Sequence, residues 1–167
     1  FHGTNVAGIV LGVAPDTRIA ALDVFRPDGF AYSSDIISAI NWCTANKTTY
    51  NIVSMNMSFG GGASTSPCTT DVFATPIANA RAAGMLSAIA SGNDGYTDRI
   101  SSPACVPTAV SVGAVYDSNV GGISYSTCTD TTTYADKVTC FSNSVSFLTM
   151  LAPGALINAA GFTMAGT

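Results

Sequence analysis

The chain has 167 residues, enough for a single domain with a sizeable buried core, and we expect residues 1–167 to belong to one domain. With 47% hydrophobic and only 10% charged residues, the composition argues against a disordered chain. The net charge of −4 argues against a nucleic-acid partner, and no apolar run approaches the roughly 18 residues of a membrane span.

Apolar runs alternate with helical patterns along the chain. In chain order we expect three helices: one from about residue 2 to 11, one starting at Ser33 or Ser34, and one from 70 or 71 that is stopped at Gly84. Strands are expected over 19–25, 52–59, 85–90, 109–116 and 145–151. The expected strands are continuously apolar, which indicates a parallel sheet covered on both faces. The sequence therefore predicts an α/β fold, a doubly wound three-layer arrangement with a mostly parallel sheet.

The five cysteines favour two disulfides. Cys128 and Cys140 flank a Thr/Asp-rich stretch typical of a hairpin loop, which suggests a local bridge. Cys68 and Cys105 both lie in polar segments and are candidates for a second bridge, whereas Cys43 falls in a helical pattern and is expected to be a buried free thiol. No Cys-x-x-Cys spacing is present, so a zinc site is not expected. Disulfides favour an oxidising compartment and hence secretion.

His2 is the only histidine, and it opens the run His-Gly-Thr-Asn-Val-Ala-Gly. This pattern puts an imidazole at the start of a helix whose small residues allow close packing. A general base needs such rigid support. A lone histidine is nevertheless more often a surface or core residue than a catalytic one.

Two further segments follow expected strands. Asn93 lies in Ser-Gly-Asn-Asp-Gly and has two interpretations: a residue that tolerates a left-handed turn, or a side-chain amide aimed at a developing oxyanion. On its own the turn is favoured. Residues 58–61, Ser-Phe-Gly-Gly, lack both phosphate-binding signatures, and a strand end of this kind can pair with an extended peptide instead. Carboxyl ends of parallel strands share one edge, so both segments are expected there.

Six motifs in order carry a resemblance to a known family. They are His2-Gly3-Thr4-Asn5-Val6-Ala7-Gly8, Gly12-Val13-Ala14-Pro15, Asn56-Met57-Ser58-Phe59-Gly60-Gly61, Ser91-Gly92-Asn93-Asp94-Gly95, Val112-Gly113-Ala114 and Ala152-Pro153-Gly154. Over nearly its whole length the chain resembles the subtilisin-like serine proteases.

The resemblance implies a serine endopeptidase with a polypeptide substrate, secreted and monomeric. His2 would be the general base and Asn93 the oxyanion donor. The substrate-binding walls would be Ser58, Phe59 and Gly60 on one side and Ala90, Ser91 and Gly92 on the other, with Ser101 near the floor of the pocket. The absence of a charged residue among them leads us to expect a preference for medium or large apolar side chains.

The resemblance also implies that the nucleophilic serine follows Thr167, because Gly166-Thr167 is similar to the start of the family's Gly-Thr-Ser motif. The orienting aspartate would precede Phe1, since Asp23 and Asp35 occupy unsuitable positions. The chain is then expected to be a partial peptidase domain, truncated at both ends and inactive by itself.

Several positions depart from the family pattern. Residues 9–11 run directly into Gly12, which leaves no room for a known calcium loop, and Thr149 replaces a common calcium-binding aspartate. No cofactor is certain and no metal-binding residue is assigned: calcium remains a possible ligand, but the family's calcium positions are not retained. The segment from about 125 to 141 is longer than usual. Asn5 replaces the usual second histidine and is expected to face the helix packing.

Two alternatives remain at this stage. One is a subtilase-like scaffold without catalysis. The other is a doubly wound domain that binds a small ligand at its Gly-rich edge, of which a flavodoxin-like cofactor protein is the weakest form because no phosphate signature is present.

Overall fold

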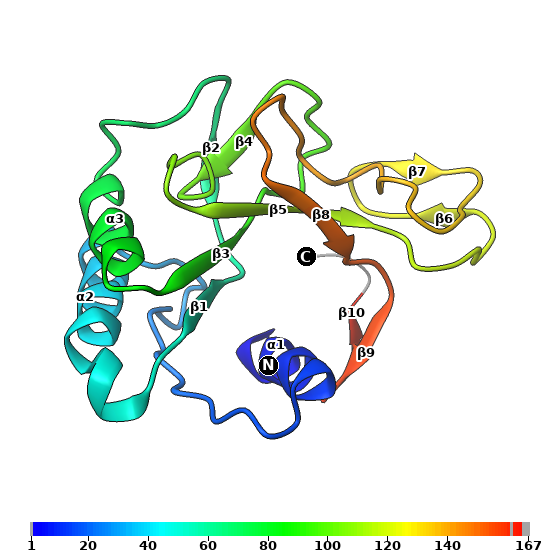
Figure 1. Cartoon of the computed structure of the whole chain (residues 1–167). Helices are drawn as coiled ribbons and strands as arrows, with labels where there is room; N and C mark the ends of the chain where they lie inside the picture. The colour runs from blue at the N-terminus through cyan, green and yellow to red at the C-terminus, as the bar shows by residue number, and fades with distance from the viewer. Residues whose placement is uncertain (1, 161, 165–167) are drawn as a thin grey trace.

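A four-stranded parallel sheet forms the centre of the molecule (Figure 1). The computed structural model describes residues 2–160 and 162–164. The sheet has the order β1-β3-β5-β8, with bounds β1 Ser54–Met57, β3 Leu86–Ala90, β5 Val110–Val115 and β8 Met150–Pro153. All three neighbouring pairs are parallel. β3, β5 and β8 are mostly apolar, whereas β1 reads Ser-Met-Asn-Met. Burial alternates along β1, β3 and β5, so one face of the sheet is more exposed than the sequence predicts for continuously apolar strands covered on both faces.

Helices lie on both sides of the sheet in this view. Helices α2 (Ser33–Tyr50) and α3 (Ala74–Ala82) pack against each other, and α3 also contacts β3 (Figure 1). Helix α1 (His2–Val13) lies beyond β1 on the other side, where it contacts β9 (Ile157–Ala159). β9 pairs with β10 (Phe162–Met164). The α/β class with a mostly parallel sheet is confirmed.

The main core lies between α2, α3 and the sheet. Ile36 and Ile40 lie one turn apart on α2 and are buried, as is Ile77 of α3 at 0% exposure. From the sheet side, Met85 and Ile89 complete this contact. Apolar burial of this kind contributes about 25 cal/mol per Å² and fixes the position of β3 and its carboxyl end.

The expected strand over 19–25 is wrong. Residues 17–26 have neither helix nor strand in the structure, and Ile19, Leu22 and Phe25 remain 42%, 40% and 44% exposed. Among the described residues β1 pairs only with β3, so this run has no strand beside it. An apolar run forms a strand only where a neighbouring strand provides backbone hydrogen-bond partners.

Two other boundaries also differ from expectation. The strand expected over 145–151 is β8, which begins only at Met150 and continues to Pro153. The preceding residues turn, with the Leu148 N–H donating to the Val145 carbonyl at 3.0 Å, and pack their apolar side chains on the core. Helix α3 begins at Ala74 rather than at 70 or 71, because the Asp71 carboxylate accepts the Phe73 N–H at 2.9 Å in a turn.

Between β5 and β8 the chain makes a hairpin excursion. It contains the antiparallel pair β6 (Ile123–Ser124) and β7 (Thr129–Asp130), and the Cys128–Cys140 disulfide closes it, as expected. Asp130 is buried and accepts hydrogen bonds from Lys137 Nζ at 2.5 Å and from the Tyr116 hydroxyl at 2.9 Å. These contacts tie the hairpin to the end of β5.

The second disulfide joins two loops near the other end of the sheet. Cys68 is bonded to Cys105, and Cys43 is a buried free thiol, both as expected. The short antiparallel pair β2 (Gly61–Ser64) and β4 (Ile100–Ser102) lies beside this bridge. Within the described part of the chain, no helix is both long and apolar enough to cross a membrane.

Candidate active site

The carboxyl ends of β1 and β3 lie side by side. Met57 is in register with Ile89, so Ser58 leaves β1 at the level where Ala90 ends β3. The two predicted walls of the substrate pocket, 58–60 and 90–92, therefore start from adjacent strand ends. The structure brings these two segments together at one edge of the sheet.

Ser101 lies between the two segments. Its side chain is 3% exposed, and its backbone N–H donates to the Ser91 carbonyl at 2.9 Å. A β-carbon on Gly60 would lie 3.0 Å from the Ser101 β-carbon, and one on Gly92 would lie 2.5 Å from its hydroxyl. Both glycines thus face the same serine, which is where the sequence predicts the pocket floor.

The first wall is supported from its far side. β2 follows Gly60 and pairs with β4, where Gly61 is opposite Ser102. Phe59 is half-buried, and its ring meets that of Phe25 edge to face, with the centroids 5.8 Å apart. Part of the irregular 17–26 segment therefore covers this wall.

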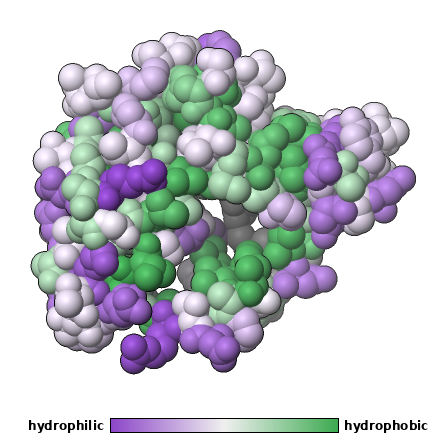
Figure 2. All heavy atoms as spheres, viewed as in Figure 1, coloured by the Kyte–Doolittle hydropathy of each residue, from purple (hydrophilic) through white to green (hydrophobic). Residues whose placement is uncertain are grey.

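His2 lies at the N-terminal end of α1, half-buried in a cleft of about 170 Å³. The lining residues come from α1, the β1 end and the segment after β8: His2, Asn5, Val6, Ile9, Val10, Asn56, Ser58, Pro153, Gly154 and Ile157. The space-filling view shows a hollow between α1 and the strand ends, with apolar residues around it (Figure 2). His2 and Ser58 thus line the same cleft.

Helix α1 approaches its neighbours closely because its residues are small. A β-carbon on Gly8 would lie 2.7 Å from the backbone nitrogen of Ala160, so the helix packs against the β9 segment rather than against the sheet itself. Asn5 is fully buried, in keeping with its expected position in the helix packing. This packing fixes the position of helix α1, and with it the position of His2.

Asn93 lies in the loop after β3 and is exposed. The glycines on either side, Gly92 and Gly95, have φ of +113° and +71°, values that few other residues adopt. Asn93 itself has no positive φ, so the left-handed conformation expected at Asn93 falls on the two glycines instead, and the exposed Asn93 carboxamide is accessible at the same edge of the sheet. The predicted Gly166-Thr167 segment lies outside the described residues.

Two functional candidates were not predicted from the sequence. Asn56 donates from Nδ2 to the Ser58 hydroxyl at 2.9 Å and lines the His2 cleft. Asn143 is fully buried and bonds to the loop that carries Asn93. Asn56 stands in the Asn-Met-Ser-Phe-Gly-Gly motif, but no role of its own was predicted for it. Asn143 has no local pattern that would have revealed it, because its contacts join segments almost 50 positions apart.

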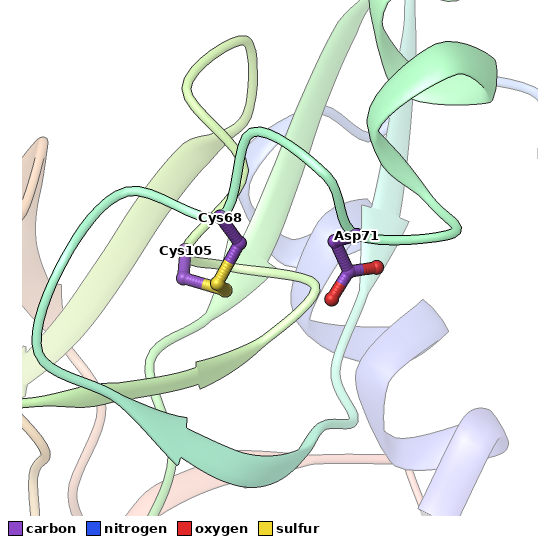
Figure 3. A group of neighbouring side chains, drawn as sticks. All are labelled: Cys68, Asp71 and Cys105. Atoms are coloured by element: carbon purple, nitrogen blue, oxygen red, sulfur yellow. A yellow bond between two sulfur atoms is a disulfide. The ribbon is translucent and has the colours of Figure 1, made fainter.

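The described residues include one cluster with the composition of a metal site: Cys68, Asp71 and Cys105 (Figure 3). The two cysteines form a disulfide, so neither offers a thiolate ligand. The Asp71 carboxylate accepts hydrogen bonds from Phe73 N–H at 2.9 Å and from the Ser102 hydroxyl at 2.8 Å. The donor set does not fit a metal ion.

Comparison with known proteins agrees with this architecture. The Subtilase family profile matches residues 1–164. An extracellular serine proteinase from Thermus sp. (strain Rt41A) is 33% identical over 166 residues, covering 97% of this chain and 34% of that protein. The subtilase-type proteinase psp3 of Schizosaccharomyces pombe is 33% identical over 180 residues, covering 99% of this chain and 35% of that protein.

A solved structure shows the same fold. A cold-adapted subtilisin-like serine proteinase superposes with a TM-score of 0.73 and 29% identity, covering 99% of this chain and 55% of that one. The fold is thus that of the subtilisin-like serine proteinases. The chain belongs to the subtilase family. It spans about a third of the length of the curated relatives it matches.

Proposed function

We propose that the full-length protein is a secreted serine endopeptidase of the subtilisin type that cleaves polypeptides through an acyl-enzyme. The observation that carries the proposal is the pairing of two strand ends around Ser101, beside the cleft that holds His2. The family match and the proteinase names of the relatives support it. Two disulfides and a relative named as extracellular support secretion.

In this proposal His2 is the general base. Its imidazole accepts the proton of the serine hydroxyl during attack on the carbonyl carbon and returns it to the leaving amine. The helix position and half-burial support this role, because a ring held by packing keeps one orientation. The serine nucleophile and the orienting aspartate are assigned to none of the 167 residues, so we expect no peptide hydrolysis by this chain alone.

Asn93 is the proposed oxyanion donor. Its exposed carboxamide lies on the loop that leaves β3, next to the pocket wall formed by Ala90, Ser91 and Gly92. A donor fixed before the reaction stabilises the tetrahedral intermediate more than the ground-state carbonyl.

The substrate would bind as an extended strand between the two walls. We expect the backbone of 58–60 to supply the β-type pairing, because on the other wall the Ser91 N–H and carbonyl and the Gly92 carbonyl already bond within the protein. The side chain before the cleaved bond would enter between Gly60 and Gly92 toward Ser101. With no charged residue at this position, apolar side chains of medium or large size are expected.

The test is peptide hydrolysis by the full-length protein and its His2→Ala and Asn93→Ala variants. We expect His2→Ala to lower kcat by about 10⁶-fold and Asn93→Ala by about 10²- to 10³-fold, magnitudes known from a subtilisin. A serine-directed phosphonate should label the full-length protein at one serine. Folded, unlabelled and inactive full-length protein would instead indicate a non-catalytic scaffold.

A further inference from the structure

Asn143 is a buried asparagine whose side-chain hydrogen bonds all go to the loop that carries Asn93. Its Oδ1 accepts the N–H groups of Asp94 and Tyr96, at 2.9 and 3.1 Å. Its Nδ2 donates to the Asp94 carboxylate at 3.1 Å. Asn143 is 0% exposed, so its side-chain atoms are shielded from water, whereas Asp94 and Tyr96 on the loop are exposed.

The backbone of Asn143 bonds to the same loop. Its N–H donates to the Gly92 carbonyl at 3.0 Å, and its carbonyl accepts the Ser91 hydroxyl at 2.7 Å. One residue therefore holds both the pocket wall and the turn that follows it.

The neighbours of Asn143 extend this contact. The Phe141 carbonyl accepts the Gly95 N–H at 2.8 Å, and the Ser144 N–H donates to the Tyr96 carbonyl at 2.7 Å. Residues 141–144 thus run along residues 91–96 and bond to them repeatedly. Asn143 is the only one of the four that bonds to both sides of Asn93 in sequence, through its backbone to Ser91 and Gly92 and through its side chain to Asp94 and Tyr96.

The loop needs such support from outside. Asn93 and Asp94 are exposed, and the flanking glycines restrict the backbone least of all residues. An oxyanion donor acts only if its position is fixed before the reaction, and a displacement of about 1 Å can cost about 10²-fold in rate.

We propose that Asn143 is a positioning residue for the reaction: it fixes the 91–96 loop so that the Asn93 amide is aimed at the oxyanion. This inference rests on the proposed peptidase function. It assigns Asn143 no contact with substrate, and its effect on catalysis passes through Asn93.

A double-mutant cycle in the full-length protein tests this. We expect Asn143→Ala to lower kcat by about 10- to 10²-fold with a smaller change in KM. In the Asn93→Ala background the same substitution should change kcat by less than about 3-fold, because the donor it positions is gone. An equal loss in both backgrounds, or no loss in either, would overturn the inference. Rates are normalised to the folded fraction by phosphonate titration.

Exchanging the donor and acceptor side chains at positions 143 and 94 tests whether the lost activity can be restored. Asn143→Asp keeps an oxygen for the two backbone N–H groups but sets a carboxylate against Asp94, so kcat should fall. Adding Asp94→Asn restores the side-chain bond with its direction reversed, and kcat should recover to within about 3-fold of the original. Failure of the double variant to recover counts against the inference. Ser146→Ala, an exposed change in the same segment, is the matched control.

Amide hydrogen exchange separates this inference from the function on which it rests. Asn143→Ala should raise exchange at the Asp94 and Tyr96 amides by at least about 10-fold and leave the amides of β5 unchanged. Unchanged exchange at those two amides overturns the inference whatever the kinetics show. If Asn93→Ala leaves kcat unchanged, the oxyanion role fails, and with it the claim that Asn143 acts through Asn93.

Discussion

Gly92 and Asn143 approach so closely that a β-carbon on Gly92 would lie 2.2 Å from the Asn143 Nδ2. Gly92 also has φ of +113°, so the position excludes larger residues on two separate grounds. The pocket wall and its support therefore depend on a glycine at this site.

We expect Gly92→Ala to destabilise the full-length protein by about 3 kcal/mol or more and to lower activity with it. Urea unfolding measures the first effect. Gly121→Ala is the control, since Gly121 has φ of +78° but open space around it, and should show only the backbone cost of about 1 kcal/mol. Equal costs at both sites would mean that the contact with Asn143 has no energetic effect.

The two disulfides should stabilise the fold to different extents. They close loops with sequence separations of 37 (Cys68–Cys105) and 12 (Cys128–Cys140), for which chain entropy predicts about 4 and 3 kcal/mol. Replacing each pair by serine should lower the free energy of unfolding accordingly. Peptide mapping without reductant should recover these two pairs and leave Cys43 unpaired; any pairing of Cys43 contradicts the structure.

Asp130 should make stability depend on acid pH. Burial acts to raise its pKa, but hydrogen bonds from Lys137, the Cys140 N–H and Tyr116 outweigh it, and the pKa of the carboxyl lies below its ordinary value of 3.8. Because the folded state favours the ionised form, this stability is fully present well above pH 4. It is lost as the pH falls through the lowered pKa.

The corresponding variant is Asp130→Asn. We expect it to cost about 3 kcal/mol at pH 7, since the Lys137 ammonium loses its charged partner and keeps only the Thr132 carbonyl, and to show a smaller further loss between pH 5 and pH 2. Lys137→Met combined with Asp130→Asn should recover part of the loss at pH 7. Identical acid unfolding profiles for the original protein and the single variant would contradict this account.

Gly60 should control the size of the pocket. A methyl group there would lie 3.0 Å from both the Ser101 β-carbon and the Ser102 carbonyl oxygen, so Gly60→Ala should displace the proposed pocket wall against its floor. We expect kcat/KM for peptides with Phe before the cleaved bond to fall by about 10-fold more than for peptides with Ala. Gly61→Ala, which meets nothing within 4 Å, is the control. A uniform loss for both peptides would mean that the pocket lies elsewhere.

The parallel sheet could be predicted because the strands can be recognised from the local sequence. Buried parallel strands are continuous apolar runs, which is why 85–90 and 109–116 were predicted almost at their observed bounds. The run at 19–25 has the same local character and yet forms no strand, because pairing depends on a neighbour that local sequence does not specify.

The residues of the candidate site also differ in whether the local sequence reveals them. His2, Asn93 and the two walls stand in short motifs, so the sequence alone proposes them as candidates. Asn143 stands in no such motif, and its bonds to Asp94 and Tyr96 span 49 and 47 positions. A buried polar residue of this kind is recognised only when the fold shows which backbone groups it satisfies.

The most direct measurement is a crystal structure of the full-length protein carrying a covalently bound peptidyl phosphonate. The account predicts phosphorus bonded to a serine, the phosphonyl oxygen about 3 Å from the Asn93 carboxamide nitrogen, and the His2 imidazole within hydrogen-bond distance of the serine oxygen. A phosphonyl oxygen bound away from Asn93, or His2 turned away from the adduct, would contradict it.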